Sequence, residues 1–392
     1  MILLHANLHP MDGPAIPDGW VRFDRKILAC GAMDCCPPIE HEPVFDAAGG
    51  WALPGLIDAH SHLGMIADAT GLEGDDINEI TDPATPHLRA IDAVNPFDRG
   101  FVEALCGGVT CVVTGPGSAN PVAGQSVALK TWGRRVDDMI VREPAAMKFA
   151  LGENPKGCYR DRDETPQTRM ATAAIIREAL AQAQEYGDKL LRAEADEDAD
   201  PPDYDAKCEA LLPVLRREVP AHFHAHQAND LFTALRIARE FQLDAVLIHG
   251  TEGHLVADLL AQEGARIVTG PSMLSRSKPE LASMNLQSAG ILQRAGVRVA
   301  ICTDHPETPQ AYLALCAAMA VRGGMEPEAA LAAVTSQAAA IAGLSNRLGT
   351  LTPGKDADIV VFSGDPLKMD TTVKAVFVDG VMRVQEGTPC GS

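Results

Sequence analysis

The chain has 392 residues, of which 46% are hydrophobic and 22% charged, and this composition excludes a disordered or low-complexity protein. Its length allows two or three domains, or one α/β barrel with a smaller companion. The formal net charge of −20 repels phosphate groups. We therefore expect no nucleic-acid partner, because a field of this sign opposes binding to a phosphate backbone.

The cysteines and the N-terminal segment bear on the expected location of the protein. Ten cysteines are scattered along the chain and none forms a CxxC pair, which is typical of a reduced protein. The first residues lack the basic segment of an export signal, and no apolar run reaches about 18 residues. We therefore expect a cytoplasmic protein without a membrane span, which could form a homo-oligomer.

Strand-like and helical patterns follow one another in a regular order. Residues 1–50 alternate short apolar segments with Gly, Pro and Asp turns, which predicts small β-strands. From residue 51 onward, β-rich segments alternate with helical patterns. The expected strands are 52–59, 109–114, 147–151, 221–226, 245–249, 266–269 and 297–302. The expected helices are 96–105, 168–186, 229–241, 252–262 and 285–294, followed by two Ala-rich helices that end near residue 342.

These repeated units predict an α/β fold. Parallel strands joined by crossover helices follow from the β-then-α order, and nearly eight units favour a closed (β/α)8 TIM barrel over an open sheet. Strand patterns return at 358–362 and 373–379. We expect the barrel to span 51–346, and residues 1–50 and 347–392 to form together a small β-sandwich domain.

Histidines and one acid stand where several of the apolar strands end. The segment 53–62 leads an apolar run into His60 and His62, which share one face of a strand because side chains alternate with period two. Similar runs end at His224 with His226, at His249, and at Asp304. A single histidine at a strand end is more often a hydrogen-bonded core group. Four such ends would meet at the mouth of a barrel, and imidazoles with a carboxylate suit a catalytic zinc-type site.

Several of these segments resemble the amidohydrolase superfamily, in particular its imidazolonepropionase-like and prolidase-like branch. The resemblance rests on PGLIDAHSH at 54–62, the HAH and IHG strand ends, TDHP at 303–306, and LGTLTPGKDADIVVFSGDP at 348–366. It covers nearly the whole chain. It implies a distorted (β/α)8 barrel, a β-sandwich made by both termini, and a metal-dependent hydrolase that cleaves an amide-type C–N bond.

The resemblance also implies roles for individual residues. The implied metal ligands are His60, His62, His224, His249 and Asp304. Asp304 would also accept the proton of the attacking water, a suitable task for a carboxylate beside an activated water. The expected cofactor is zinc, as one or two divalent ions.

Lys148 decides between one metal and two. It resembles the strand-4 lysine that is carboxylated in binuclear relatives and bridges both metals through a carbamate. Two alternatives remain open at this point: a lysine paired with Glu153 or with substrate, and a buried lysine whose charged end reaches solvent.

Substrate recognition is less evident in the sequence. The expected loop 115–125 lacks the GK[ST] of a nucleotide-binding loop, so we expect another small-molecule substrate. Candidate substrate contacts are Asn120, Gln125, His226 and Arg276, against the ordinary alternatives of loop capping and a surface salt bridge. The expected reaction is hydrolysis of a linear or cyclic amide. Deamination of a ring amidine and a catalytically silent scaffold are the rival hypotheses.

Overall fold

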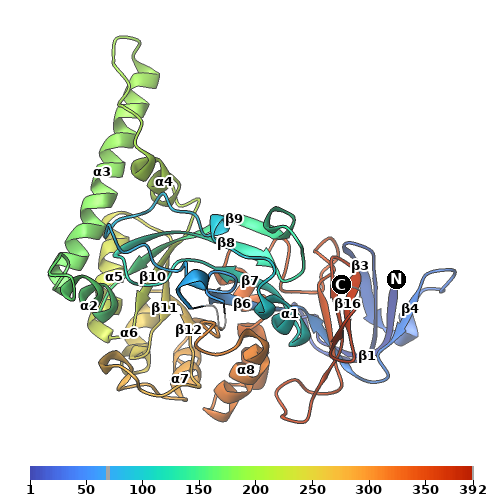
Figure 1. Cartoon of the computed structure of the whole chain (residues 1–392). Coiled ribbons are helices and arrows are strands. Elements are labelled where there is room, and N and C mark those ends of the chain that lie inside the picture. The colour runs from blue at the N-terminus through green and yellow to red at the C-terminus, as the bar shows by residue number, and fades with distance from the viewer. Residues whose placement is uncertain (68–70, 391–392) are drawn as a thin grey trace.

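The computed structural model describes residues 1–67 and 71–390. It consists of a barrel surrounded by helices and a separate β-sheet beside it (Figure 1). The first and the last of the described strands lie in the separate sheet, where blue N-terminal strands stand next to red C-terminal ones (Figure 1). The expectation of an α/β barrel with a β-rich part built from both termini is therefore confirmed.

The terminal sheet interleaves strands from the two ends of the chain. Its path runs β17-β16-β15-β14-β5-β1-β2-β3, and β4 pairs with β1. Strand β5 is parallel to β1 and antiparallel to β14, so the pairing of β5 with β14 joins the halves. The strands are β1 (Ile2–Leu8), β2 (Ile16–Phe23), β3 (Ile27–Ala32), β4 (Val44–Asp46), β5 (Trp51–Pro54), β14 (Ile359–Phe362), β15 (Val373–Val378), β16 (Val381–Gln385) and β17 (Thr388–Pro389).

A buried ion cluster ties this sheet to the barrel. Lys130 is 3% exposed, and its Nζ lies 2.7 Å from Asp358 Oδ2 and 3.1 Å from Asp356 Oδ2. Asp379 Oδ1 lies 3.3 Å from the same nitrogen. A buried ammonium is costly unless it is paired, so these carboxylates fix the end of the barrel strand that carries Lys130 against the sheet.

The barrel consists of eight neighbouring strands in the order β13-β12-β11-β10-β9-β8-β7-β6. Strands β6 and β13 lie beside each other, and His62 N donates to His305 O across this gap at 2.9 Å, so the barrel nearly closes. The strands are β6 (Leu56–Ser61), β7 (Val109–Thr114), β8 (Val122–Lys130), β9 (Ile140–Ala150), β10 (Ala221–Ala225), β11 (Ala245–His249), β12 (Arg266–Thr269) and β13 (Arg298–Ile301).

Strand β8 departs from the predicted pattern. It is antiparallel to both β7 and β9, whereas the other neighbouring pairs of the barrel are parallel. The predicted loop 115–125 is therefore too long, because its last residues, Val122–Gln125, already belong to β8. No helix lies between β7 and β8. A short connection of this kind makes antiparallel neighbours, and the β-then-α pattern could not reveal it.

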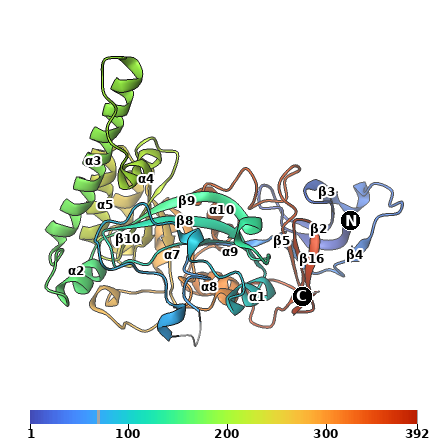
Figure 2. The ribbon, with the colours of Figure 1, turned by 45° about the horizontal axis from the view of Figure 1, so that its top comes forward.

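Helices surround the barrel, and one pair extends away from it. Helices α3 and α4 form an arm that projects from the barrel (Figures 1 and 2). Helix α3 begins after Thr168, whose Oγ1 accepts from Ala171 N at 3.1 Å, and continues to Ala195, past the predicted end at 186. The helices are α1 (Arg99–Cys106), α2 (Glu153–Arg160), α3 (Arg169–Ala195), α4 (Ala206–Leu215), α5 (Ala228–Glu240), α6 (Ala257–Gln262), α7 (Ser288–Arg294), α8 (Leu313–Arg322), α9 (Pro327–Ala333) and α10 (Ser336–Ile341).

The barrel strands are packed as a core. Val246, Ile248 and Val268 belong to one buried apolar cluster with Ala338 and Ile341 of α10. Helix α10 packs against β6, β12 and β13. Among the described residues, no helix combines the length and apolarity that a membrane crossing requires.

Candidate metal centre

The first group of candidate ligands joins both sides of the barrel closure. His60 lies near the end of β6 and His62 comes directly after the strand, with the centres of the two rings 5.2 Å apart. Asp304, just after β13, places Oδ1 3.2 Å from His60 Nε2 and 3.5 Å from His62 Nε2. The Nδ1 of His62 lies 2.7 Å from Gly115 O, which leaves Nε2 directed at the site. The structure brings these three of the expected ligands together.

A second group brings together His224, His226 and His249. Their ligand atoms all lie within 4.8 Å of one another. His249 Nδ1 contacts Gly270 O at 2.7 Å, and His226 Nδ1 contacts Thr251 Oγ1 at 2.7 Å. We expected His226 as a substrate contact, and its place in this group also makes it a candidate ligand.

The imidazole of His60 and those of the second group are held neutral. Burial lowers the pKa of His60 well below its ordinary value, and nearby Lys148 lowers it further. Burial, with neighbouring imidazoles, does the same to the pKa of His224 and of His226. Burial also lowers the pKa of His249 to about 4. Neutral imidazole is the form that binds a metal, so the site is prepared for one at neutral pH.

Asp304 contributes a carboxylate to the site. Burial by itself would raise the pKa of its carboxyl, but His249, His60 and His62 hold that pKa well below its ordinary value. Its Oδ1 is buried, and among the described residues only His60 Nε2 and His62 Nε2 face it, in positions that do not form a well-aligned hydrogen bond. A buried carboxylate oxygen without a donor is costly, and a cation between the imidazoles would satisfy it.

The backbone turns sharply at two of these positions. Asp304 has φ of 53° and His249 has φ of 73°, both in the left-handed region. Side chains other than glycine adopt this region at a cost of about 1 to 3 kcal/mol, and such strain clusters at functional sites. Here the turn directs each side chain toward the shared site as its strand ends.

Lys148 lies two residues before the end of β9, and its side chain contacts the first group of candidate ligands. It is 1% exposed, and its Nζ lies 3.3 Å from His60 Nε2. Burial lowers the pKa of this ammonium to about 8. More of the amine is therefore neutral near pH 8 than in an ordinary lysine, and the neutral amine is the form that reacts with carbon dioxide. Lys148 does not pair with Glu153, one of the alternatives considered from the sequence.

The residues fit a divalent metal such as zinc. Imidazole nitrogens and carboxylate oxygens are the donors that zinc takes at catalytic sites, and both groups supply them at mutual ligand distances. His60, His62 and Asp304 would hold one ion, and His224 and His249 a second. Lys148 lies beside the first of these groups, with its Nζ next to His60 Nε2.

Asp58 supports the site and was not singled out from the sequence. It is buried, and its Oδ2 accepts from Thr303 Oγ1 at 2.6 Å, Thr303 N at 3.0 Å and Gln310 Nε2 at 2.6 Å. Its Oδ1 accepts from His60 N at 3.2 Å. Burial raises the pKa of this carboxyl to about 7. Asp58 thus binds the residue before Asp304 to the strand that carries His60, and its position within PGLIDAHSH was the available signal.

A cavity of about 380 Å³ opens over both groups. Its floor includes His62, His224 and Asp304, and the segment after β12 supplies Leu274 and Lys278 to its wall. The lining is polar and apolar in similar measure, and a concave site with convergent polar groups is typical of small-molecule binding. The parallel strands end there, as is usual for the active sites of α/β barrels.

The structure places the other three expected substrate contacts outside this cavity lining. Asn120 Nδ2 donates to Glu79 O at 2.6 Å and to Thr85 Oγ1 at 3.0 Å, while its Oδ1 accepts from Tyr159 at 2.7 Å. Gln125 Nε2 donates to Pro86 O at 3.2 Å. Arg276 donates to the carbonyls of Ala282 and Met284 at 3.1 and 2.7 Å, within its own loop. Each side chain fastens a loop in this structure.

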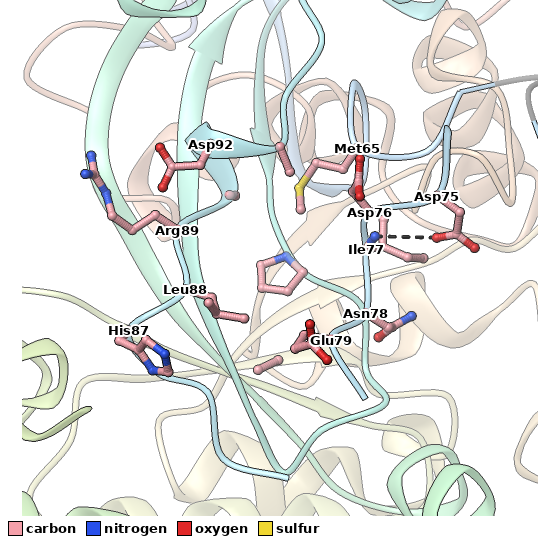
Figure 3. Close-up of a pocket in the computed structure, with 14 residues that line it drawn as sticks. Met65, Asp75, Asp76, Ile77, Asn78, Glu79, His87, Leu88, Arg89 and Asp92 are labelled. Carbon is pink, nitrogen blue, oxygen red and sulfur yellow. Dashed lines mark hydrogen bonds between the residues drawn. The ribbon is translucent and has the colours of Figure 1, made fainter. Parts of the chain in front are cut away.

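A second cavity, of about 340 Å³, adjoins the first (Figure 3). Ile77 and Asn78 line both cavities, so the segment 75–79 separates them. Asp75 and Asp76 border the second cavity on one side, and Arg89 and Asp92 border it on the other (Figure 3). Its acids form no group with mutual ligand distances among the described residues. The residues of both candidate ligand groups line or adjoin the first cavity.

Comparison with known proteins identifies the family to which this chain belongs. The family model "Amidohydrolase family" matches residues 51–383. The solved structure of an amidohydrolase from Thermotoga maritima is 38% identical, with 98% of this chain and 99% of that chain covered and a TM-score of 0.94.

Two curated relatives are similar in sequence. An imidazolonepropionase from Cupriavidus metallidurans is 28% identical, with 91% of this chain and 88% of the relative covered. The amidohydrolase tasK from Hapsidospora irregularis is 30% identical over 88% of this chain, which spans only 37% of that relative. The chain belongs to the amidohydrolase family and is a hydrolase that acts on C–N bonds.

Proposed function

We propose that this protein hydrolyses an amide or cyclic amide with a water activated at a zinc centre in the barrel mouth. The observation that carries the proposal is the convergence of His60, His62 and Asp304 with a second histidine group under one cavity. The similarity to an imidazolonepropionase supports a cyclic amide within this substrate class. The bound metal would supply Lewis-acid polarisation of the carbonyl and a lowered pKa for water.

The chain's own residues then move the proton. Asp304 is held as a carboxylate and accepts the proton of the attacking water. As the C–N bond breaks, Asp304 returns that proton to the leaving nitrogen, which departs as a neutral amine. Burial of the surrounding imidazoles keeps them neutral, so they act as ligands and do not compete for the proton.

We further propose that Lys148 is carboxylated and bridges two ions. Its neutral amine would add to carbon dioxide, form a carbamate and release one proton. The support is the buried ammonium beside His60 and its pKa of about 8. The carbamate would carry a negative charge, which would offset part of the positive charge of the ions.

The test of the base assignment is Asp304→Asn. Wild-type protein loaded with zinc is screened on dipeptides, N-acyl amino acids and cyclic ureides, with release of amine, carboxylate and ammonia measured separately. We expect Asp304→Asn to lower kcat by at least about 10³-fold on the substrate found, while most of the metal remains bound. Unchanged turnover would refute the assignment, and ammonia release from ring amidines alone would favour deamination.

A further inference from the structure

One cation stands on the wall of the cavity above the metal centre. Among the lining residues that the structure describes, Lys278 is the lone lysine or arginine. It lies in the segment after β12, two residues beyond Arg276, and it is half-buried. The protein has a formal net charge of −20, so a lone positive charge in the lining of this cavity is a candidate contact for an anionic group of a ligand.

Lys278 is held beside the second histidine group. Its Nζ donates to Asn154 Oδ1 at 2.9 Å, and Asn154 Nδ2 donates to Ser118 Oγ at 2.7 Å. The same Nδ2 lies 3.5 Å from His224 Nε2. The ammonium is therefore one side chain away from a candidate ligand, close enough to depress the pKa values of His224, His226 and His249 after larger effects.

The loop that carries Lys278 is anchored across the mouth. Glu153 N, at the start of α2, donates to Glu280 Oε1 at 2.5 Å, and Glu280 N donates back to Glu153 Oε2 at 3.3 Å. This reciprocal pair fastens the loop after β12 to the loop after β9. The ammonium is thus positioned before substrate arrives, which reduces the entropy lost on binding.

Within the described part of the chain the ammonium forms no direct ion pair: its hydrogen-bonding partner is the neutral amide of Asn154, and the carboxylate of Glu280 interacts with it only through space. Ile66, Ile77, Leu274 and Leu281 supply apolar surface to the same cavity. A cation beside apolar walls suits a ligand that has both an anionic end and an apolar body.

We propose that Lys278 binds a carboxylate of the substrate, next to the C–N bond that is cleaved. This inference rests on the proposed function and narrows it to amides of the N-acyl amino acid type, including cyclic ones that carry a free carboxylate. The apolar side chain of the substrate would lie against Leu274 and Leu281, and the hydrogen bond to Asn154 would keep the Lys278 ammonium in position for the carboxylate. Lys278 thereby takes the role that the sequence suggested for Arg276.

The experiment measures binding and does not depend on turnover. Zinc-loaded protein is titrated calorimetrically with N-methylphosphonyl derivatives of leucine and proline, which imitate the tetrahedral state of amide hydrolysis. Each free acid is compared with its neutral carboxamide, in the wild type and in Lys278→Met. We expect at least one acid to bind about tenfold or more tightly than its carboxamide to the wild type, because hydrogen bonds to charged groups are strong. We expect that preference to fall below about threefold in Lys278→Met while the carboxamide affinity stays the same.

Two further variants separate a specific role from general damage. Lys278→Arg should restore most of the preference for the acid, because it restores the cation. Lys189→Met makes the same change on α3, where Lys189 pairs with Glu185 on the surface, and should keep the full preference. A preference retained in Lys278→Met would overturn the inference, as would equal binding of acid and carboxamide to the wild type. If neither probe binds the zinc-loaded wild type, the narrowing to N-acyl amino acids is overturned, whereas the proposed function is judged separately by the substrate screen and Asp304→Asn.

Discussion

Removal of the Asp58 carboxylate tests how much the joint between β6 and the segment after β13 contributes to stability. In Asp58→Ala, the four donors that now reach this carboxylate from His60, Thr303 and Gln310 lose their acceptor inside the protein. A buried donor left unsatisfied costs about 1 to 3 kcal/mol. With the lower figure for each of four donors, the expected loss is about 4 kcal/mol. The lower figure is appropriate because a carboxyl with a pKa of about 7 is only partly ionised at neutral pH.

Urea denaturation followed by tryptophan fluorescence measures this loss at constant pH and zinc concentration. Asp58→Asn keeps one acceptor oxygen and should lose roughly half as much stability. The matched control is Asp198→Ala, which removes an exposed carboxylate and should change stability by less than about 0.5 kcal/mol. A loss below about 1 kcal/mol in Asp58→Ala would show that the four donors find other partners, and the reasoning would be wrong.

Two further predictions concern the metals and the ion cluster. Lys148→Ala should lower the bound metal from two ions per chain to one, and we expect the ion of the His60 group to remain. Elemental analysis that finds an unchanged metal content would contradict the bridging carbamate. The pKa of Asp356 is held at about 2 by Lys130, Lys26 and Arg347, although burial by itself would raise it. The ionised carboxylate therefore stabilises the fold at pH values above its unfolded pKa, which is near 4. That contribution, about 2 kcal/mol, is lost as the pH falls from about 4 through 2. Urea midpoints measured from pH 6 to 2 should therefore fall more steeply in the wild type than in Asp356→Asn, and equal slopes would count against the prediction.

Much of the fold and the ligand types could be predicted because they depend on local patterns. The alternation of side chains along a strand puts His60 and His62 on one face, and the β-then-α order makes successive strands parallel neighbours. The strand-end positions of His224, His249 and Asp304 then follow from barrel geometry, since parallel strands end at the same mouth. These expectations needed no knowledge of contacts between distant residues.

The tertiary structure decided the features that depend on distant contacts. Strand β8 is antiparallel because it returns without a helix, a fact that its own residues do not disclose. Arg276 and Lys278 are both cations of one loop, yet carbonyls of that loop bind the first while Asn154, 124 positions away, holds the second over the cavity. Asp58 supports Thr303 from 245 positions away. The sequence by itself therefore determined which chemistry stands at each strand end, whereas long-range hydrogen bonds, which no local pattern encodes, decided which loop side chains face the substrate.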